Sequence, residues 1–80
     1  MYPAVKSVVA GEDYVLSIVF ENGEHGTLDM KEILDFGIFR RLKERSAFRR
    51  VRVGFDTIEW ESGVDLDPEF VYARCERRVT

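Results

Sequence analysis

The spacing of apolar side chains in the first part of the chain predicts a β-meander. Residues 4–10 are rich in valine, and in residues 14–20 the large apolar residues Leu16, Ile18 and Phe20 fall on one face. This two-residue period is typical of a strand that buries one side. Residues 11–13 are expected to form the turn between the two strands.

Asn22 and Gly23 come one residue after the second strand and indicate a hairpin. Both residues tolerate the positive φ of a type I′ turn, so we expect a two-residue loop that sets Phe20 against His25. This register places His25 on the Phe20 face. The returning strand, residues 24–28, has a glycine at its centre, and we expect it to lie near a sheet edge.

The middle of the chain predicts two short helices. Asp29 is expected to cap the first, with Glu32 three residues later as in a capping box, and Gly37 ends it. The second helix is expected over residues 38–45. Its inner apolar stripe consists of Ile38, Phe39 and Leu42.

A second hairpin follows, and two patterns agree on its register. Pairing about a turn at residues 55–56 sets apolar residues against each other, with Val51 opposite Trp60. The same register sets arginine against glutamate, with Arg52 opposite Glu59. Trp60 alternates with charged neighbours, so we expect it in the core.

The last part of the chain predicts a turn and a short helix. Gly63 and Asp65 are expected to form the turn, Asp67 caps the helix, and Pro68 occupies its first position, where a missing N–H is harmless. The helix is expected to reach about residue 75. Residues 76–80 are expected to fray.

Together these elements predict one α+β domain over residues 1–80. It is a small antiparallel β-rich domain with an N-terminal β-meander, two short central helices, a second hairpin and a short C-terminal helix. Whether the hairpins share one sheet stays open. A chain of 80 residues with 45% hydrophobic residues suits a single modest core, which would gain stability from docking on a second copy or on a partner.

The composition also indicates where the protein works. Cys75 is the only cysteine, so no internal disulfide can form and a reducing cytoplasm is expected. Residues 1–10 do not have the pattern of a signal peptide. No apolar run approaches the ~20 residues that span a bilayer, so no membrane association is expected.

Candidate catalytic and metal-binding residues are few. His25 is the only histidine, so neither a serine–histidine arrangement nor a metal cluster assembles around it. The acidic run Asp65, Asp67 and Glu69 lacks the central glycine and distal glutamate of a calcium loop. We therefore expect no catalytic residues, no metal and no cofactor.

Basic side chains are concentrated between residues 40 and 52, although the net charge of the chain is −3. The arginines of the second hairpin have glutamates opposite them. The candidate partner-binding residues are therefore the other basic ones and one aromatic: Arg40, Arg41, Lys43, Arg45, Arg49 and Tyr72. An acidic protein face is the expected target, contact with nucleic-acid phosphates is the alternative, and a merely solvated helix face explains the same pattern.

The run IEWESGVDLDPE, residues 58–69, resembles the hallmark of a bacterial family called domain of unknown function 2442. Asn22, Gly23 and Asp29 fit the same family, whereas Val64 stands where a smaller residue is expected. The resemblance implies a small α+β domain, often encoded beside another small protein as in toxin–antitoxin pairs, and it assigns no functional residues. The expected function is a protein-interaction module that acts as the antitoxin-like member of a two-gene pair. The alternative is a nucleic-acid-binding accessory protein that uses the basic helix 40–49.

Overall fold

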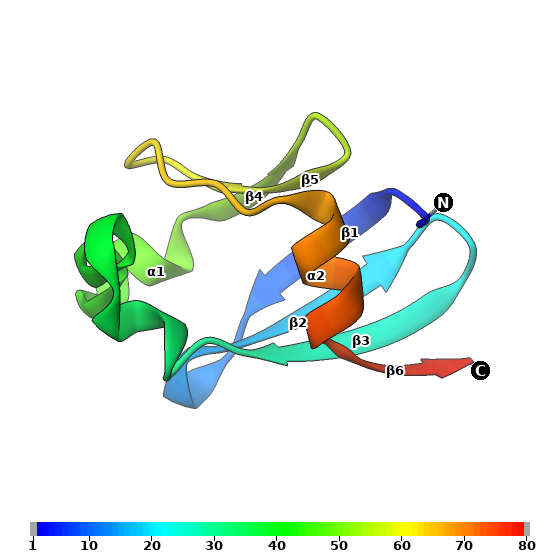
Figure 1. The fold of residues 1–80 in the computed structure, drawn as a ribbon, viewed down its shortest axis with the longest axis horizontal. Coiled ribbons are helices and arrows are strands. Elements are labelled where there is room, and N and C mark those ends of the chain that lie inside the picture. Colours follow the sequence, from blue (N-terminus) through cyan, green and yellow to red (C-terminus); the bar gives the residue numbers. More distant parts are fainter. Residues whose placement is uncertain (1, 80) are drawn as a thin grey trace.

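The computed structural model describes residues 2–79 and contains two separate antiparallel sheets (Figure 1). The larger sheet has the strand order β1-β2-β3-β6. Its strands are β1 (Val5–Ala10), β2 (Val15–Phe20), β3 (Glu24–Asp29) and β6 (Glu76–Val79). The smaller sheet is the hairpin of β4 (Val51–Gly54) and β5 (Thr57–Trp60). The two predicted hairpins therefore lie in different sheets, and the α+β class is confirmed.

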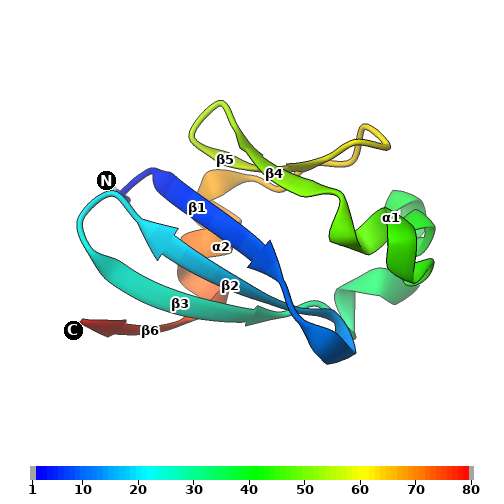
Figure 2. The same ribbon diagram turned by 180° about the vertical axis from the view of Figure 1, so that it is seen from behind.

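Short helices connect and cover these sheets. The 3₁₀ helices are η1 (Glu12–Tyr14), η2 (Ile33–Asp35) and η3 (Gly37–Lys43), and the α-helices are α1 (Arg45–Arg49) and α2 (Pro68–Arg74). Helix α2 crosses one face of the larger sheet (Figure 1). Figure 2 shows the molecule from the opposite side. The segment from η2 to α1 lies at one end of the molecule, and the β4–β5 hairpin lies along β1.

The core lies between the inner face of the larger sheet, α2 and the β4–β5 hairpin. Trp60 is fully buried, and its Nε1 donates a hydrogen bond of 2.9 Å to the Phe48 carbonyl. Thr57 is also buried, and its hydroxyl donates to the Leu66 carbonyl at 2.8 Å. The hydrogen bonds of these two buried side chains offset the cost of removing their polar groups from water. The prediction of Trp60 as a core residue is confirmed.

The second hairpin has the predicted register. Val51 faces Trp60, and Arg52 faces Glu59 at 3.2 Å between Nη2 and Oε2. Its turn residues Phe55 and Asp56 both have positive φ, 50° and 67°, as a type I′ turn requires. The predicted helix start is confirmed as well, with Asp67 as the N-cap of α2 and Pro68 as its first residue.

The first hairpin differs from the prediction by one residue. Val19, not Phe20, faces His25, because the loop has three residues and only Gly23, at φ 90°, is in the left-handed region. The Gly23 N–H donates to the Phe20 carbonyl at 3.0 Å, the arrangement of a tight turn followed by a glycine bulge. A one-residue slip exchanges the faces of a strand. His25 is therefore exposed, and Gly26 lies on the core side.

The C-terminal residues that were expected to fray form β6 instead. Strand β6 pairs with Glu24–Thr27 of β3, so β3 is internal there and the prediction of an edge strand was wrong for this part. The remaining residue of the predicted frayed segment, residue 80, lies outside the described residues. Gly63 makes the predicted turn at φ 95°, while Asp65 contributes an isolated backbone bridge to Glu59.

The central helices also need correction. The second one is 3₁₀ and ends at Lys43, after which Glu44 is extended and α1 begins. A 3₁₀ helix has three residues per turn, so Phe39 and Leu42 share the inner face while Ile38 is half exposed. The Asp29 carboxylate accepts the Lys31 N–H at 2.9 Å as a cap would, but no side-chain cap bond is present at the start of η2, so the predicted capping box does not form.

Candidate functional site

The basic residues predicted to bind a partner have different surroundings in the structure. Lys43 forms an ion pair with Asp35 at 2.7 Å, and the Arg40 guanidinium donates to the Asp35 carbonyl at 3.0 Å. The Lys43 ammonium holds the pKa of the Asp35 carboxyl below its usual value. Both cations therefore already interact with Asp35 of the same chain.

The other three basic residues are exposed and lie on two different helices. Arg41 belongs to η3, whereas Arg45 and Arg49 belong to α1. The extended residue Glu44 separates the two helices. The continuous basic helix of the prediction is therefore divided in two.

Tyr72, the aromatic candidate for partner binding, connects elements of the fold and is half buried. Its hydroxyl donates to Glu24 at 2.6 Å, and its ring contacts Phe20 edge to face at 5.2 Å between centroids. The Arg77 guanidinium lies 3.8 Å from the ring centroid. The hydrogen bond from Tyr72 keeps the pKa of Glu24 below its ordinary value. Tyr72 therefore joins α2 to β3 and β6.

Cys75 is a buried structural thiol. Burial raises its pKa, which outweighs the opposite effect of the nearby Arg77. Within residues 2–79 no group of three or more histidine, cysteine, aspartate or glutamate side chains is arranged to hold a metal ion.

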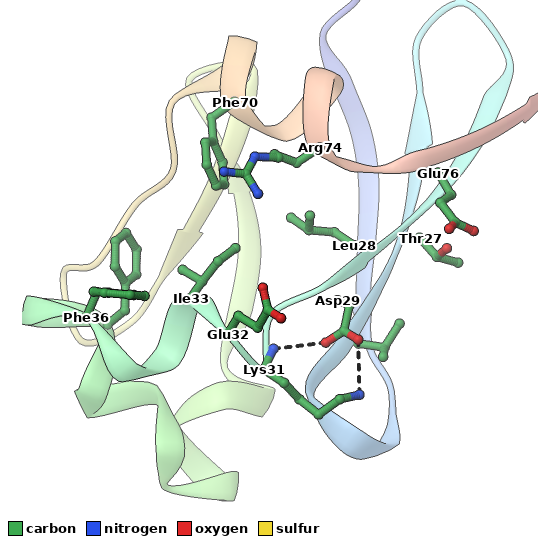
Figure 3. Close-up of a pocket in the computed structure, with 12 residues that line it drawn as sticks. Thr27, Leu28, Asp29, Lys31, Glu32, Ile33, Phe36, Phe70, Arg74 and Glu76 are labelled. Carbon is green, nitrogen blue, oxygen red and sulfur yellow. Dashed lines mark hydrogen bonds and ion pairs between the residues drawn. The ribbon is translucent and has the colours of Figure 1, made fainter.

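A hollow in the surface lies between α2, the end of β3 and the η2–η3 segment (Figure 3). Its volume is about 770 Å³. Large apolar side chains from four separate elements line it. These are Leu28, Ile33, Phe36, Phe39 and Phe70. We refer to this hollow as the α2–β3 groove.

Phe36 is the most exposed of these side chains, with 69% of its surface open to solvent. It lies at the junction of η2 and η3, where its N–H closes the last turn of η2 on Ile33. Gly37 follows at φ 52°, a left-handed conformation that glycine adopts without strain. The reversal at Gly37 therefore holds Phe36 at the mouth of the groove.

Charged residues form the rim of the groove. Lys31 lies within 3.1 Å of Asp29, and the Lys31 N–H lowers the pKa of the Asp29 carboxyl. The Arg74 guanidinium lies over the Phe70 ring at 5.1 Å, as Figure 3 shows. Two rim acids, Glu32 and Glu76, have no ion pair among the described residues. The groove therefore combines an apolar floor with a slightly acidic rim.

The prediction from sequence did not find this groove. Neither Phe36 nor Phe70 is among the candidate partner-binding residues predicted from the sequence, and Tyr72 is the one aromatic residue among them. The one available signal was Phe36 directly before Gly37, which places an aromatic residue at a chain reversal.

One protein family is similar to this chain in sequence. None of the helices within residues 2–79 is long and apolar enough to cross a membrane. Comparisons with curated proteins and with solved structures gave no significant match. One family, described as protein of unknown function (DUF2442), matches residues 5–77. This match extends over nearly the whole chain and confirms the resemblance seen in the Trp60–Pro68 region, so the chain belongs to the DUF2442 family.

Proposed function

We propose that this protein is a protein-interaction module that binds a segment of a partner protein in the α2–β3 groove. The observation that carries the proposal is the exposure of Phe36 at the mouth of an apolar groove. Burial of such a side chain contributes about 1.5–3 kcal/mol. Large aromatic residues that become buried in a pocket are typical of the residues that dominate interface energies.

The lining of the groove supports binding and not catalysis. It contains no histidine, cysteine or serine, so the most common general base and the serine and cysteine nucleophiles are not among its lining residues. Asp29 is engaged by Lys31. Glu32 and Glu76, which have no ion pair within residues 2–79, favour a partner segment that carries lysine or arginine beside its apolar residues. Such charge complementarity steers association and selects partners.

The family resemblance adds an expectation about the partner. It implies a small protein encoded alongside, as a toxin is beside its antitoxin, and we propose that the groove is the surface on which such a partner docks. The sequence alone favoured a partner with an acidic face. We propose a partner with a basic segment instead, since two of the five basic candidate residues have partners within the chain.

The test is a selection of random peptides displayed on phage against the immobilised protein, followed by affinity measurements. Phe36→Ser removes the groove aromatic. Phe55→Ser is the matched control, because Phe55 is 97% exposed and does not line the groove. We expect selected peptides to lose at least tenfold in affinity for Phe36→Ser and to bind Phe55→Ser like the parent. Selection of no peptide, or equal binding to both variants, would overturn the proposal.

The nucleic-acid alternative rests on the exposed cations Arg41, Arg45 and Arg49. It is tested by the fluorescence polarisation of labelled DNA and RNA oligonucleotides at two salt concentrations. A phosphate-binding patch requires affinity that falls steeply with salt and falls again when all three residues are changed to glutamate. If the parent and the triple variant bind equally, or not at all, the alternative is rejected.

A further inference from the structure

We propose that the segment bound in the α2–β3 groove is an extended strand that adds to the open edge of β3. This inference rests on the proposed function and specifies its mode of binding. The partner is a peptide segment with alternating apolar side chains and at least one flanking lysine or arginine. Its backbone would continue the larger sheet at the point where β6 stops.

The edge of β3 is only partly covered. Strand β6 pairs with β3 from Glu24 to Thr27, and no described strand pairs with Leu28 or Asp29 on that side. The chain before Glu76 turns away into α2, which crosses the inner face of the sheet (Figure 1). An open edge two residues long therefore remains at the end of β3.

The backbone groups of Asp29 point toward this open side. Met30 donates its N–H to the Tyr14 carbonyl at 2.9 Å, so Met30 bonds to the β2 side. In an antiparallel ladder the direction of these bonds alternates from residue to residue. The N–H and C=O of Asp29 therefore point away from β2, where the described residues supply no backbone partner for them. Backbone donors and acceptors of this kind are the template for strand addition.

The groove reaches this edge and is lined by residues from both faces of the sheet. Leu28 is buried on the inner face, whereas Thr27 and Asp29 are exposed on the outer one. All three line the same hollow. Figure 3 shows Thr27 and Glu76 at one end of it, and Phe36 and Phe70 at the other. A hollow that contacts both faces must open beside the strand, which is the position an added strand would occupy.

The side chains of the groove match an extended ligand. Successive residues of a strand point to opposite faces, so alternate residues of the ligand would contact the apolar side chains Ile33, Phe36 and Phe70. Glu32 and Glu76 would pair with basic residues of the ligand. A helical ligand would leave the Asp29 backbone groups without partners, and its apolar residues would recur every three or four positions.

The experiment uses peptides selected on the parent protein as described above. We expect their apolar residues to recur every second position, with a lysine or arginine nearby. Bound peptide should slow the hydrogen exchange of the Asp29 amide by at least tenfold. N-methylation of the peptide backbone should abolish binding at positions that face β3 and leave it within about twofold at the intervening positions, which serve as the matched control.

Three results would overturn this inference. The first is a groove-dependent peptide with helical periodicity and no protection of Asp29, which would leave the proposed function standing. The second is the absence of any peptide sensitive to Phe36→Ser, which would remove the proposed function as well. The third is a dimeric parent protein that Phe36→Ser converts to a monomer, which would identify a second copy of the chain as the occupant.

Discussion

Substitution of Gly26 by alanine distinguishes the observed register of the first hairpin from the one predicted by the sequence. In the structure a Cβ at this position would lie 2.9 Å from the Cys75 sulfur and 3.3 Å from the Phe20 ring. In the predicted register residue 26 would point to solvent. The same change should therefore destabilise the protein in one case and stabilise it in the other.

The expected magnitude follows from two opposing effects. Alanine is favoured over glycine within a strand by about 0.5–1 kcal/mol, because less backbone entropy is lost on folding. Overpacking of a close-packed core costs about 1–3 kcal/mol. We expect a net loss of about 1–2 kcal/mol, which would lower the melting temperature by roughly 5–15 °C in a domain of this size.

The assay is urea denaturation of a double-mutant cycle. Cys75→Ala removes the sulfur that the new Cβ would meet, so Gly26→Ala should cost less than about 1 kcal/mol in that background, a coupling of about 1 kcal/mol. His25→Ala is the control on the outer face and should change stability by less than about 0.5 kcal/mol. Stabilisation by Gly26→Ala, with no coupling to Cys75, would refute the register.

Three further predictions concern single side chains. Trp60→Phe should cost roughly 2–4 kcal/mol in urea denaturation, because the buried carbonyl of Phe48 loses its donor and a smaller ring fills the site. Phe55→Asn should raise the free energy of unfolding by about 0.5–1 kcal/mol, since asparagine tolerates the left-handed φ of 50° better than phenylalanine does; a decrease would contradict the turn geometry. The lowered pKa of Glu24 stabilises the fold above the ordinary glutamate pKa of about 4.3, and this contribution is lost as the pH falls through the lower folded pKa. Tyr72→Phe should therefore lose less stability between pH 7 and pH 3 than the parent does, and an unchanged pH profile would argue against the hydrogen bond.

The second hairpin was predictable because two kinds of information agree within ten residues of sequence. Apolar residues such as Val51 and Trp60, and charged residues such as Arg52 and Glu59, require the same pairing. The cap and first residue of α2 were predictable for a similar reason, since capping is a local interaction between neighbours.

The first hairpin and β6 were less predictable because their pairing depends on contacts that the local sequence does not determine. Asn22 and Gly23 are compatible with loops of two or three residues, and the glycine at position 26 gives no apolar signal that would choose between them. Strand β6 reads as a charged tail, Glu76 to Arg78, with little apolar alternation. It forms because it pairs with the edge of β3, a strand about fifty residues earlier in the chain.

The candidate site was the least predictable part. Phe36 and Phe70 are far apart in the sequence, and each fits the pattern of an internal residue when considered alone. The groove appears only when α2 crosses the sheet and β6 stops short of the end of β3. The charge pattern of the sequence pointed instead to the five basic candidates between Arg40 and Arg49. Two of these, Arg40 and Lys43, have partners within the chain.

The most direct test of the groove as the contact surface is an amide chemical-shift titration of the ¹⁵N-labelled parent protein with a selected peptide. We expect the largest shifts to cluster at Leu28, Asp29, Ile33, Phe36 and Phe70. Shifts concentrated instead at Arg41, Arg45 and Arg49, or at the Phe55 turn, would contradict it.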